Sequence, residues 1–321
     1  MLCTIEDVLS IPLMSNQAAR PTAWLNRLLG AADAHIKSWC KQNLEQAYYT
    51  DYYNGSDGRD LICRQGPVLV GQTTLAAAMD GLTLPQTTIT VASTAGFHPG
   101  LQGGTSDAIR NPPPGVSVRT GVNTYAYVTY TGTTATTFTG CSGGTGTLDA
   151  DYDDVFSPVL WHDPAGYYGQ SADAFPQGSQ LVLGSNYAVQ LDGGSTRRLS
   201  KRGLIRRIGG AGAAFLGFYP ENYYSGKLAG HRLPTWPRGD GNLKLCYTAG
   251  YPAYSQEGRE LAYACAMLVA QMIRIQPSGT DLSSENMGNY SYSAKQAFDA
   301  PELGEVRRVL APYRDLTWGN D

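Results

Sequence analysis

The residue types that most often carry out catalysis are sparse in this chain, and their spacing does not assemble a reactive site. There are four histidines among 321 residues, and no two of them lie within one helical turn of each other. The sequence contains no GxSxG serine motif, no HExxH zinc motif and no phosphate-binding loop. We therefore predict that the protein is not an enzyme and uses no cofactor, and we expect structural roles for His35, His98, His162 and His231.

A cluster of aspartates is the best candidate for a metal site. Asp149, Asp151, Asp153 and Asp154 lie close together in the sequence, and clustered carboxylate oxygens are the ligands that Ca²⁺ prefers. The run lacks the ligand spacing and the glycine of an EF-hand loop, however. This pattern favours a solvated acidic loop, and we predict no metal site.

The sharpest local signal is a basic segment at residues 197–207, which holds six cations in eleven residues. Three interpretations remain open. In an oligomer the cations would form a positive surface that contacts DNA phosphates, or the same surface would dock on an acidic partner protein. In the third interpretation the segment is a hairpin whose apolar residues pack while the cations face water. The candidate contact residues are Arg197, Arg198, Lys201, Arg202, Arg206 and Arg207.

The composition is typical of a folded, β-rich protein with large contact surfaces. The 24 Lys and Arg residues nearly balance the 27 Asp and Glu residues, so net charge predicts neither nucleic-acid binding nor an acidic tail. Glycine and tyrosine are both abundant, at 38 and 21 residues. The six cysteines form no CxxC pair, which favours reduced, buried thiols and synthesis inside a cell. The N-terminus lacks the pattern of a signal peptide.

Helical patterns lie at the two ends of the chain. Thr4, followed by two acidic residues, predicts a short helix that Pro12 ends. A longer amphipathic helix begins near residue 21 and runs to about residue 40, because its apolar residues recur at steps of three and four. Near the other end, residues 259–275 predict a helix that is apolar on nearly every side, and a last short helix is expected at 303–313.

The apolar helix at residues 259–275 needs cover on more than one side. It is too short and too closely bracketed by charged residues to span a membrane, so we expect it to be enclosed by protein. One stripe should pack on the N-terminal helix, and the last short helix is too small to cover the rest. We therefore predict that a neighbouring subunit covers the other stripe, which consists of Ala262, Ala266, Val269 and Ile273.

The residues between these helices are predicted to form mostly strands. Residues 84–148 are rich in Thr and Gly, contain neither Lys nor Glu, and show the two-residue alternation of strands with one buried face. Two strands should flank a turn at residues 54–58 as a hairpin. Further strands are expected at residues 68–70, 75–79, 87–91, 124–130, 180–183, 187–191 and 242–247.

Together these patterns predict an α+β fold with a helical core, a large β-rich middle region and an inserted β module. The core is expected from residues near 1 to 46 and 255 to 316. In more detail, we predict N-terminal helices with a β-hairpin at 1–80, the inserted module at 81–155, a β-rich region with the basic segment at 156–250, and a C-terminal helical part at 251–321.

The order of these pieces resembles the head-to-tail connector proteins of tailed phages, which are also called adaptor or head-completion proteins. The likeness covers roughly half of the chain and lies at both ends. It rests on IKSWCKQN at 36–43, DYYNGSDGRDLICRQGPV at 51–68, NLKLCYTAGYP at 242–252, LAYACAMLVAQMIR at 261–274, SSENMGNYSYS at 283–293 and VRRVLAPYR at 306–314.

The resemblance implies a structural protein of the virion neck, made in the host cytoplasm and not bound to a membrane. Its implied partners are the portal protein, the next tail or stopper protein, packaged DNA, and further copies of itself in a ring, expected to be a dodecamer. The basic segment would then line the DNA channel or dock on the portal. The stripe formed by Ala262, Ala266, Val269 and Ile273 would lie on a ring-interface helix.

A second resemblance concerns the middle of the chain. Residues 84–100 and 127–147 are similar to a short β motif that is inserted in various phage virion proteins. This chain has Ser142 where that motif usually has a basic residue, and it has a Pro-rich loop where the motif has a short hairpin. The aromatic residues of the loops support an alternative function: a β-rich virion decoration or glycan-binding module that stacks sugars on Trp161 or Trp236.

Overall fold

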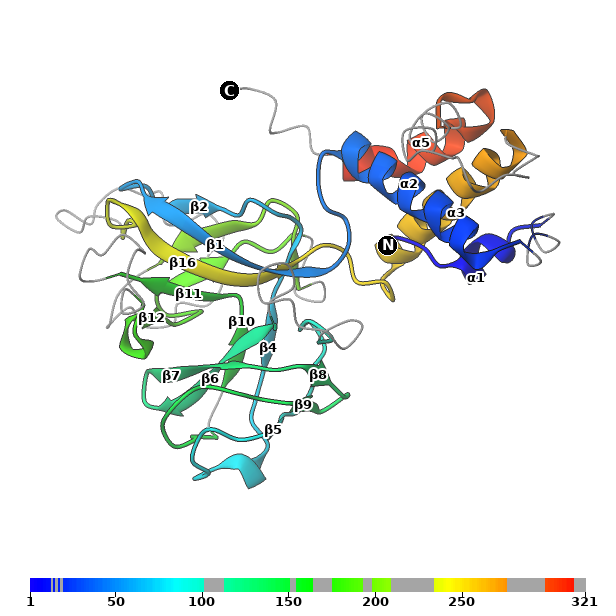
Figure 1. Ribbon diagram of the computed structural model, residues 1–321. Helices are drawn as coiled ribbons and strands as arrows, with labels where there is room; N and C mark the ends of the chain where they lie inside the picture. Colours follow the sequence, from blue (N-terminus) through cyan, green and yellow to red (C-terminus); the bar gives the residue numbers. More distant parts are fainter. Residues whose placement is uncertain are drawn as a thin grey trace. The chain divides into compact units, whose positions relative to one another are not determined.

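The structure is a computed structural model, shown in Figure 1. It describes residues 1–12, 14, 17, 20–100, 113–150, 154–163, 175–192, 198–208, 234–275 and 298–314. Among these residues, no helix combines the length and the apolar character that crossing a bilayer requires. All six cysteines are free and buried.

The chain folds as two compact units, and the helical one is built from both ends of the chain. Met1–Gln46 and Gly250–Asp321 form the helical unit, and Ala47–Ala249 forms the β unit. Helices thus combine with several antiparallel sheets, as in an α+β protein. The unit boundaries differ from the predicted ranges, because residues 47–80 fold with the β unit and not with the helices.

The helical unit holds α1 (Ile5–Leu9), α2 (Thr22–Cys40), α3 (Gln256–Ile275) and α5 (Gly304–Leu310), with short 3₁₀ turns at Pro301–Leu303 and Ala311–Tyr313. These helices lie where the sequence predicts helices. The start of α1 is capped as expected. The backbone N–H of Asp7 donates to Thr4 Oγ1 at 3.2 Å, and the N–H of Thr4 donates to Asp7 Oδ2 at 2.7 Å. Both amides would otherwise lack partners inside the helix.

α3 is the central helix of this unit, because α1, α2 and α5 all pack against it. Close packing at its first turn requires a glycine: a Cβ atom on Gly258 would lie 2.1 Å from the carbonyl oxygen of Pro252. Cover from three helices of the same chain explains why the sequence of α3 is apolar on several sides. Its buried residues are Gly258, Leu261, Ala264, Cys265, Ala266, Leu268, Val269, Ala270, Met272 and Ile273.

An aromatic cluster fastens the chain before α5 to α2. The ring of Phe298 is 2% exposed, and its centroid lies 4.9 Å from the His35 ring and 5.4 Å from the Trp39 ring, both on α2. On α5, the guanidinium of Arg307 lies 6.0 Å from the Phe298 ring and also donates to the Phe298 carbonyl. Phe298 therefore joins two helices that the sequence places far apart.

The largest sheet of the β unit is arranged around its longest strand, β16 (Gly239–Ala249). Along one side of β16 runs β1 (Ala47–Gly55), and Figure 1 shows these two strands beside each other. On the other side, β11 pairs with the middle of β16 and β3 with its end. The remaining strands of the sheet are β3 (Val68–Leu69), β11 (Val159–His162), β12 (Gln180–Leu181) and β14 (Leu199–Ser200).

Three smaller antiparallel sheets complete the described part of the β unit. One follows the order β13-β15-β2, with β2 (Asp60–Ile62), β13 (Tyr187–Val189) and β15 (Leu204–Arg207). The second follows β4-β10-β6-β7, with β4 (Gly71–Thr73), β6 (Gly115–Gly121), β7 (Thr124–Thr129) and β10 (Val155–Ser157). The third follows β5-β9-β8, with β5 (Thr88–Thr90), β8 (Gly132–Thr133) and β9 (Thr137–Thr139). A 3₁₀ turn at Gln177–Ser179 precedes β12.

The Thr/Gly-rich region has a hydrophobic core of its own. Its buried apolar residues run from Leu75 to Val155 and come from strands of the two sheets β4-β10-β6-β7 and β5-β9-β8 and from the segments that connect them. At the centre of this core, the Phe138 ring lies 5.2 Å from the Phe97 ring and 4.8 Å from the Tyr130 ring. A separate core within residues 47–249 is what an inserted module requires.

Two local predictions are wrong. The strands on either side of residues 54–58 do not pair as a hairpin, since β1 pairs with β16 and β2 pairs with β15. The turn between them is instead bonded to Trp236, which exchanges backbone hydrogen bonds with Asp57 and Gly58. The strand predicted near residues 75–79 is also wrong. A 3₁₀ turn spans Ala77–Met79, and consecutive alanines have little preference for strands.

Candidate interaction surfaces

Two cations of the basic segment sit at the tip of a tight turn between β14 and β15. The N–H of Gly203 donates to the carbonyl of Ser200 at 3.2 Å, which closes the turn. Gly203 has a φ of 57°, and a Cβ atom there would lie 2.8 Å from the Cys63 Cβ atom, so this position requires glycine. Lys201 and Arg202 occupy the two central positions and are exposed. Their charges are therefore free to meet an external anion.

Arg206 is held by an ion pair inside the β unit. Its Nε lies 2.7 Å from Asp60 Oδ1, and its Nη2 lies 3.0 Å from Asp60 Oδ2. The two residues are register partners on β15 and β2, so the pair ties these strands together. Hydrogen bonding to Arg206 keeps the pKa of Asp60 below its usual value. Much of the Arg206 charge is thus balanced by a neighbour.

Arg207 and Arg198 are also engaged within the β unit. The Arg207 guanidinium lies 5.4 Å from the centre of the Trp236 ring, and burial lowers the pKa of Arg207. Arg198 donates to the carbonyl of Gln72. Arg197 lies outside the described residues. Of the five described cations, Lys201 and Arg202 are therefore the two best placed to contact a partner.

The hairpin interpretation of the basic segment is wrong in its strand pairing. β14 pairs with β3, whereas β15 pairs with β2 and β13, so the two arms of the segment belong to different sheets. The apolar residues of the segment do pack inward in part, since Ile205 is fully buried.

The structure places most of the predicted subunit-interface stripe of α3 inside the helical unit. Ala266, Val269 and Ile273 are 1%, 0% and 6% exposed, and only Ala262 is half-buried. Helix α1 packs against α3 and supplies cover that the sequence argument assigned to a neighbouring subunit. Burial of these residues thus needs no second chain.

A different stripe of α3 faces solvent. Arg259, Tyr263 and Arg274 are exposed and Met267 is half-buried, and these positions fall on one side of a helix. Tyr263 is the largest apolar group among them, and 52% of it is exposed. Sequence reasoning did not single it out, although Tyr263 interrupts an otherwise apolar run at residues 261–270. The hydroxyl group of Tyr263 within this apolar run was the one sequence feature that could have indicated its exposure.

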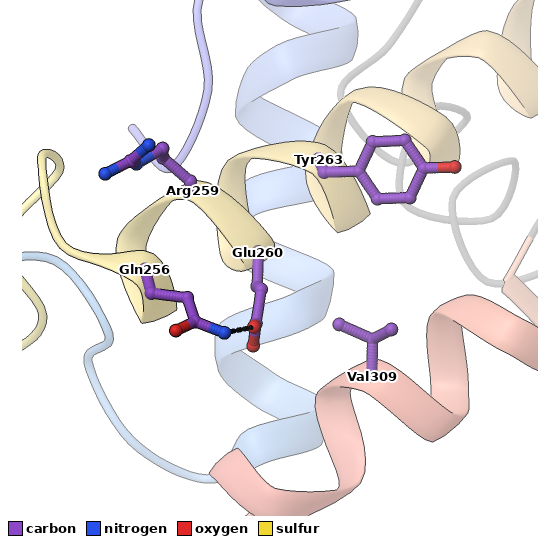
Figure 2. A pocket seen from close by; sticks show the side chains of 5 residues that line it. All are labelled: Gln256, Arg259, Glu260, Tyr263 and Val309. Carbon is purple, nitrogen blue, oxygen red and sulfur yellow. Dashed lines mark hydrogen bonds between the residues drawn. The ribbon is translucent and has the colours of Figure 1, made fainter.

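Tyr263 stands between two hollows on the surface of the helical unit. The first, of about 510 Å³, lies between α3 and α5 and is lined by Gln256, Arg259, Glu260, Tyr263 and Val309, as Figure 2 shows. The second, of about 340 Å³, lies between the end of α1 and α3, and also includes Arg259 and Tyr263. A partner protein with a complementary surface can bind an exposed aromatic ring that has a hollow on each side.

Hydrogen bonds hold three of the side chains that line the first hollow. Glu260 accepts a hydrogen bond from Tyr313 Oη at 2.6 Å and another from Gln256 Nε2 at 2.9 Å. The bond from Tyr313 is the main reason that the pKa of Glu260 is lowered. Arg259 donates to the carbonyl of Tyr254 at 3.1 Å. These bonds hold the side chains around Tyr263 in place.

Among the described candidates for sugar stacking or metal binding, two tryptophans and two aspartates have contacts within the fold. Trp161 and Trp236 are 3% and 1% exposed, so neither offers a ring face to a sugar. Asp154 is fully buried and accepts the Leu75 N–H at 3.0 Å. Asp149 pairs with Arg119 at 3.1 Å. Asp151 and Asp153 lie outside the described residues, as does His231.

Comparison of the chain with protein-family models, with curated proteins and with solved structures found no match.

Proposed function

We propose that this protein is a structural adaptor of a tailed-phage virion. In this proposal, its subunits form a ring between the portal protein and the next tail or stopper protein, and DNA passes through the lumen. The observation that carries the proposal is the helical unit, which is assembled from residues 1–46 and 250–321 with the whole β unit inserted between them. A connector-type core built from both chain ends is what the resemblance of the terminal segments implies.

The ring contact is proposed to use the exposed stripe of α3 instead of the buried one. Tyr263 and Met267 would enter a neighbouring subunit, while the hollows on either side of Tyr263 would receive side chains of that neighbour. Amphipathic aromatic residues suit this role, because they bury a large area and keep a hydrogen-bonding tip. Arg259 and Arg274 would lie at the polar rim of the contact.

The turn that carries Lys201 and Arg202 is proposed to contact either DNA in the lumen or an acidic surface of the portal. Every subunit of a ring would present both cations, so the ring would repeat a small positive site around its axis. Phosphate contacts of this kind need no base recognition, as expected for a channel that conducts any sequence.

Electron microscopy of the purified chain, alone and mixed with the portal protein, tests the ring. We expect rings in at least one of the two samples. Tyr263→Glu should abolish them without unfolding the protein, because the side chain is 52% exposed. Tyr254→Glu is the matched control, since Tyr254 is a tyrosine of the same unit that is 66% exposed and lies outside α3. Strictly monomeric protein in both samples would refute the proposal.

The role of the turn is tested by the double variant Lys201→Ala with Arg202→Ala. If the turn lines the channel, assembled particles should lose DNA more readily, and binding of the ring to DNA should depend less steeply on salt, by about one unit of slope per cation removed. Arg308→Ala removes an 82% exposed cation from the helical unit and serves as the control. Normal DNA retention with weaker portal binding would assign the turn to the portal. No change in either would rule out both contacts.

A further inference from the structure

Strand β1 lies at an edge of the largest sheet, and its outward backbone groups can be identified from the register. The N–H of Asp163, beyond the end of β11, donates to the carbonyl of Asn242 at 2.8 Å. Even-numbered residues of β16 therefore point their backbone groups toward β11, and odd-numbered ones point toward β1. Their partners on β1 are Ala47, Tyr49, Asp51 and Tyr53. The N–H and C=O groups of Tyr48, Thr50 and Tyr52 must then point away from the sheet.

Few of these outward groups are hydrogen-bonded in the part of the chain that the structure describes. The only bond to them there comes from Arg64 Nη2, which donates to the Tyr52 carbonyl at 3.1 Å, and the Arg64 side chain is 59% exposed. Thr50 and Tyr52 are themselves exposed, whereas Tyr48 is only 6% exposed and its hydroxyl is hydrogen-bonded to that of Tyr127 at 2.8 Å. The other edge strands of this sheet, β12 and β14, contain two residues each. β1 has nine, and its pairing stays regular as far as Tyr53.

Natural proteins usually protect a long edge with lysine, proline or a bulge, because an open edge pairs with other strands. Residues 47–53 contain no lysine, proline or glycine, and five of the seven are Tyr or Thr, which favour strands. The segment is therefore well suited to receive another strand.

We propose that β1 pairs antiparallel with β1 of a second copy of this chain, about a twofold axis at Thr50. The register makes the segment complementary to itself. Thr50 would face Thr50 of the partner subunit, and Tyr48 would face Tyr52 of the partner subunit. Each of these pairs exchanges two backbone hydrogen bonds.

The side chains also agree with this register. Asp51 would stand opposite Tyr49 of the partner subunit, so the two carboxylates do not oppose each other. Facing threonines and facing tyrosines are favourable cross-strand pairs. Arg64 has to release the Tyr52 carbonyl, which its exposed side chain permits. An isologous contact requires a surface that complements itself, and β1 in this register meets that requirement. We therefore assign the edge to a second copy of the chain.

The proposed pair goes beyond the proposed function. A twofold contact closes at two subunits, whereas a ring is built from head-to-tail contacts. The pair is thus a separate state of the protein, present without the portal, and it uses the β unit while the ring contact is assigned to the helical unit.

Sedimentation velocity of the full chain over a range of concentrations tests the pair. We expect a wild-type dimer, and Thr50→Pro should weaken it by about 30-fold or more, since two hydrogen bonds at the axis are lost. The Thr50 N–H points outward, so proline costs no bond within the chain. Thr50→Val is the matched control. Both variants lose the contact of Thr50 Oγ1 with Cys246 Sγ, at 3.3 Å, but valine keeps the N–H.

Two further measurements keep the inference testable if the proline variant fails to fold. Thr50→Lys keeps the N–H but places two cations together at the axis, so it should also weaken the dimer. Hydrogen exchange should show the amides of Tyr48, Thr50 and Tyr52 protected at high concentration and exposed on dilution, while those of Tyr49 and Asp51 stay protected throughout.

A wild-type monomer at all concentrations would overturn the inference, and so would equal association of the valine, lysine and wild-type chains. Protection of the three outward amides only after the portal protein is added would assign the edge to that partner, which also overturns the twofold pair. Because rings differ from dimers in mass and are tested by Tyr263→Glu, rings without dimers would refute this inference alone.

Discussion

The Val269→Ala variant tests whether α3 is buried by helices of its own chain or by a neighbouring subunit. Val269 is fully buried, and it belongs to the stripe that sequence reasoning assigned to a subunit interface. If the helical unit itself covers this residue, its loss must lower the stability of a single subunit. If a neighbour covers it, the loss must instead lower assembly.

The expected size of the effect follows from the two methyl groups that are removed. Burial of these two methyl groups stabilises the fold by about 1.6 kcal/mol, at ~0.8 kcal/mol per group, and the variant loses this contribution. The cavity left behind, roughly 50 Å³, adds about 1 kcal/mol at ~24 cal/mol per Å³. We therefore expect Val269→Ala to lower the free energy of unfolding of the helical unit by about 2 to 3 kcal/mol. Tyr263→Ala, on the exposed stripe, should change it by no more than about 0.5 kcal/mol.

Urea unfolding followed by circular dichroism in the helical band measures this difference, because α1, α2, α3 and α5 all belong to the helical unit. The midpoint of the Val269→Ala variant should fall by the same amount at every protein concentration. An unchanged midpoint with lost assembly would refute the reasoning.

Two more outcomes test the packing and the electrostatics. Phe298→Ala should destabilise the helical unit by about 3 to 5 kcal/mol, because the ring is 2% exposed and contacts His35 and Trp39, and Phe298→Leu should cost clearly less in the same unfolding assay. Asp60→Asn should destabilise the β unit by about 0.2 to 1 kcal/mol at neutral pH, as expected for a partly exposed ion pair. The folded-state pKa of Asp60 is lowered, so this stabilisation is present above the unfolded pKa of about 3.9 and is lost as the pH falls through the folded value. Unfolding measured as a function of pH should show the two proteins converging in acid, and a difference that persists there would contradict the assigned role of Arg206.

The helices could be predicted from the sequence because their signals are local. The apolar steps of α2, the cap at Thr4 and the apolar run of α3 each lie within one segment. The strand pairing could not be predicted, because β1 finds its partner about two hundred residues later, at β16. A turn-like sequence at 54–58 therefore indicated a hairpin, although Trp236 holds the turn from a distant part of the chain.

The candidate surfaces were predicted less completely for a related reason. A run of cations can be read from the sequence, but the engagement of Arg206 by Asp60 and of Arg207 by Trp236 depends on which strands are neighbours. The size of the last helix suggested that α3 lacked cover, and the five-residue α1 was not considered. Exposure of Tyr263 depends on how three helices pack on α3, which periodicity within α3 alone does not determine.

The assembly of the helical unit from both chain ends also sets an order of events during synthesis. α2 leaves the ribosome early, but its packing partner α3 follows only after the 203 residues of Ala47–Ala249. At roughly 5 to 20 residues per second, α2 waits about 10 to 40 s for that partner. The three smaller sheets of the β unit, whose strands all precede β16, can form in this interval, whereas the largest sheet has to wait for β16. The helical unit must then fold last, so a nascent chain cannot present the finished surface around Tyr263 until translation has passed α3.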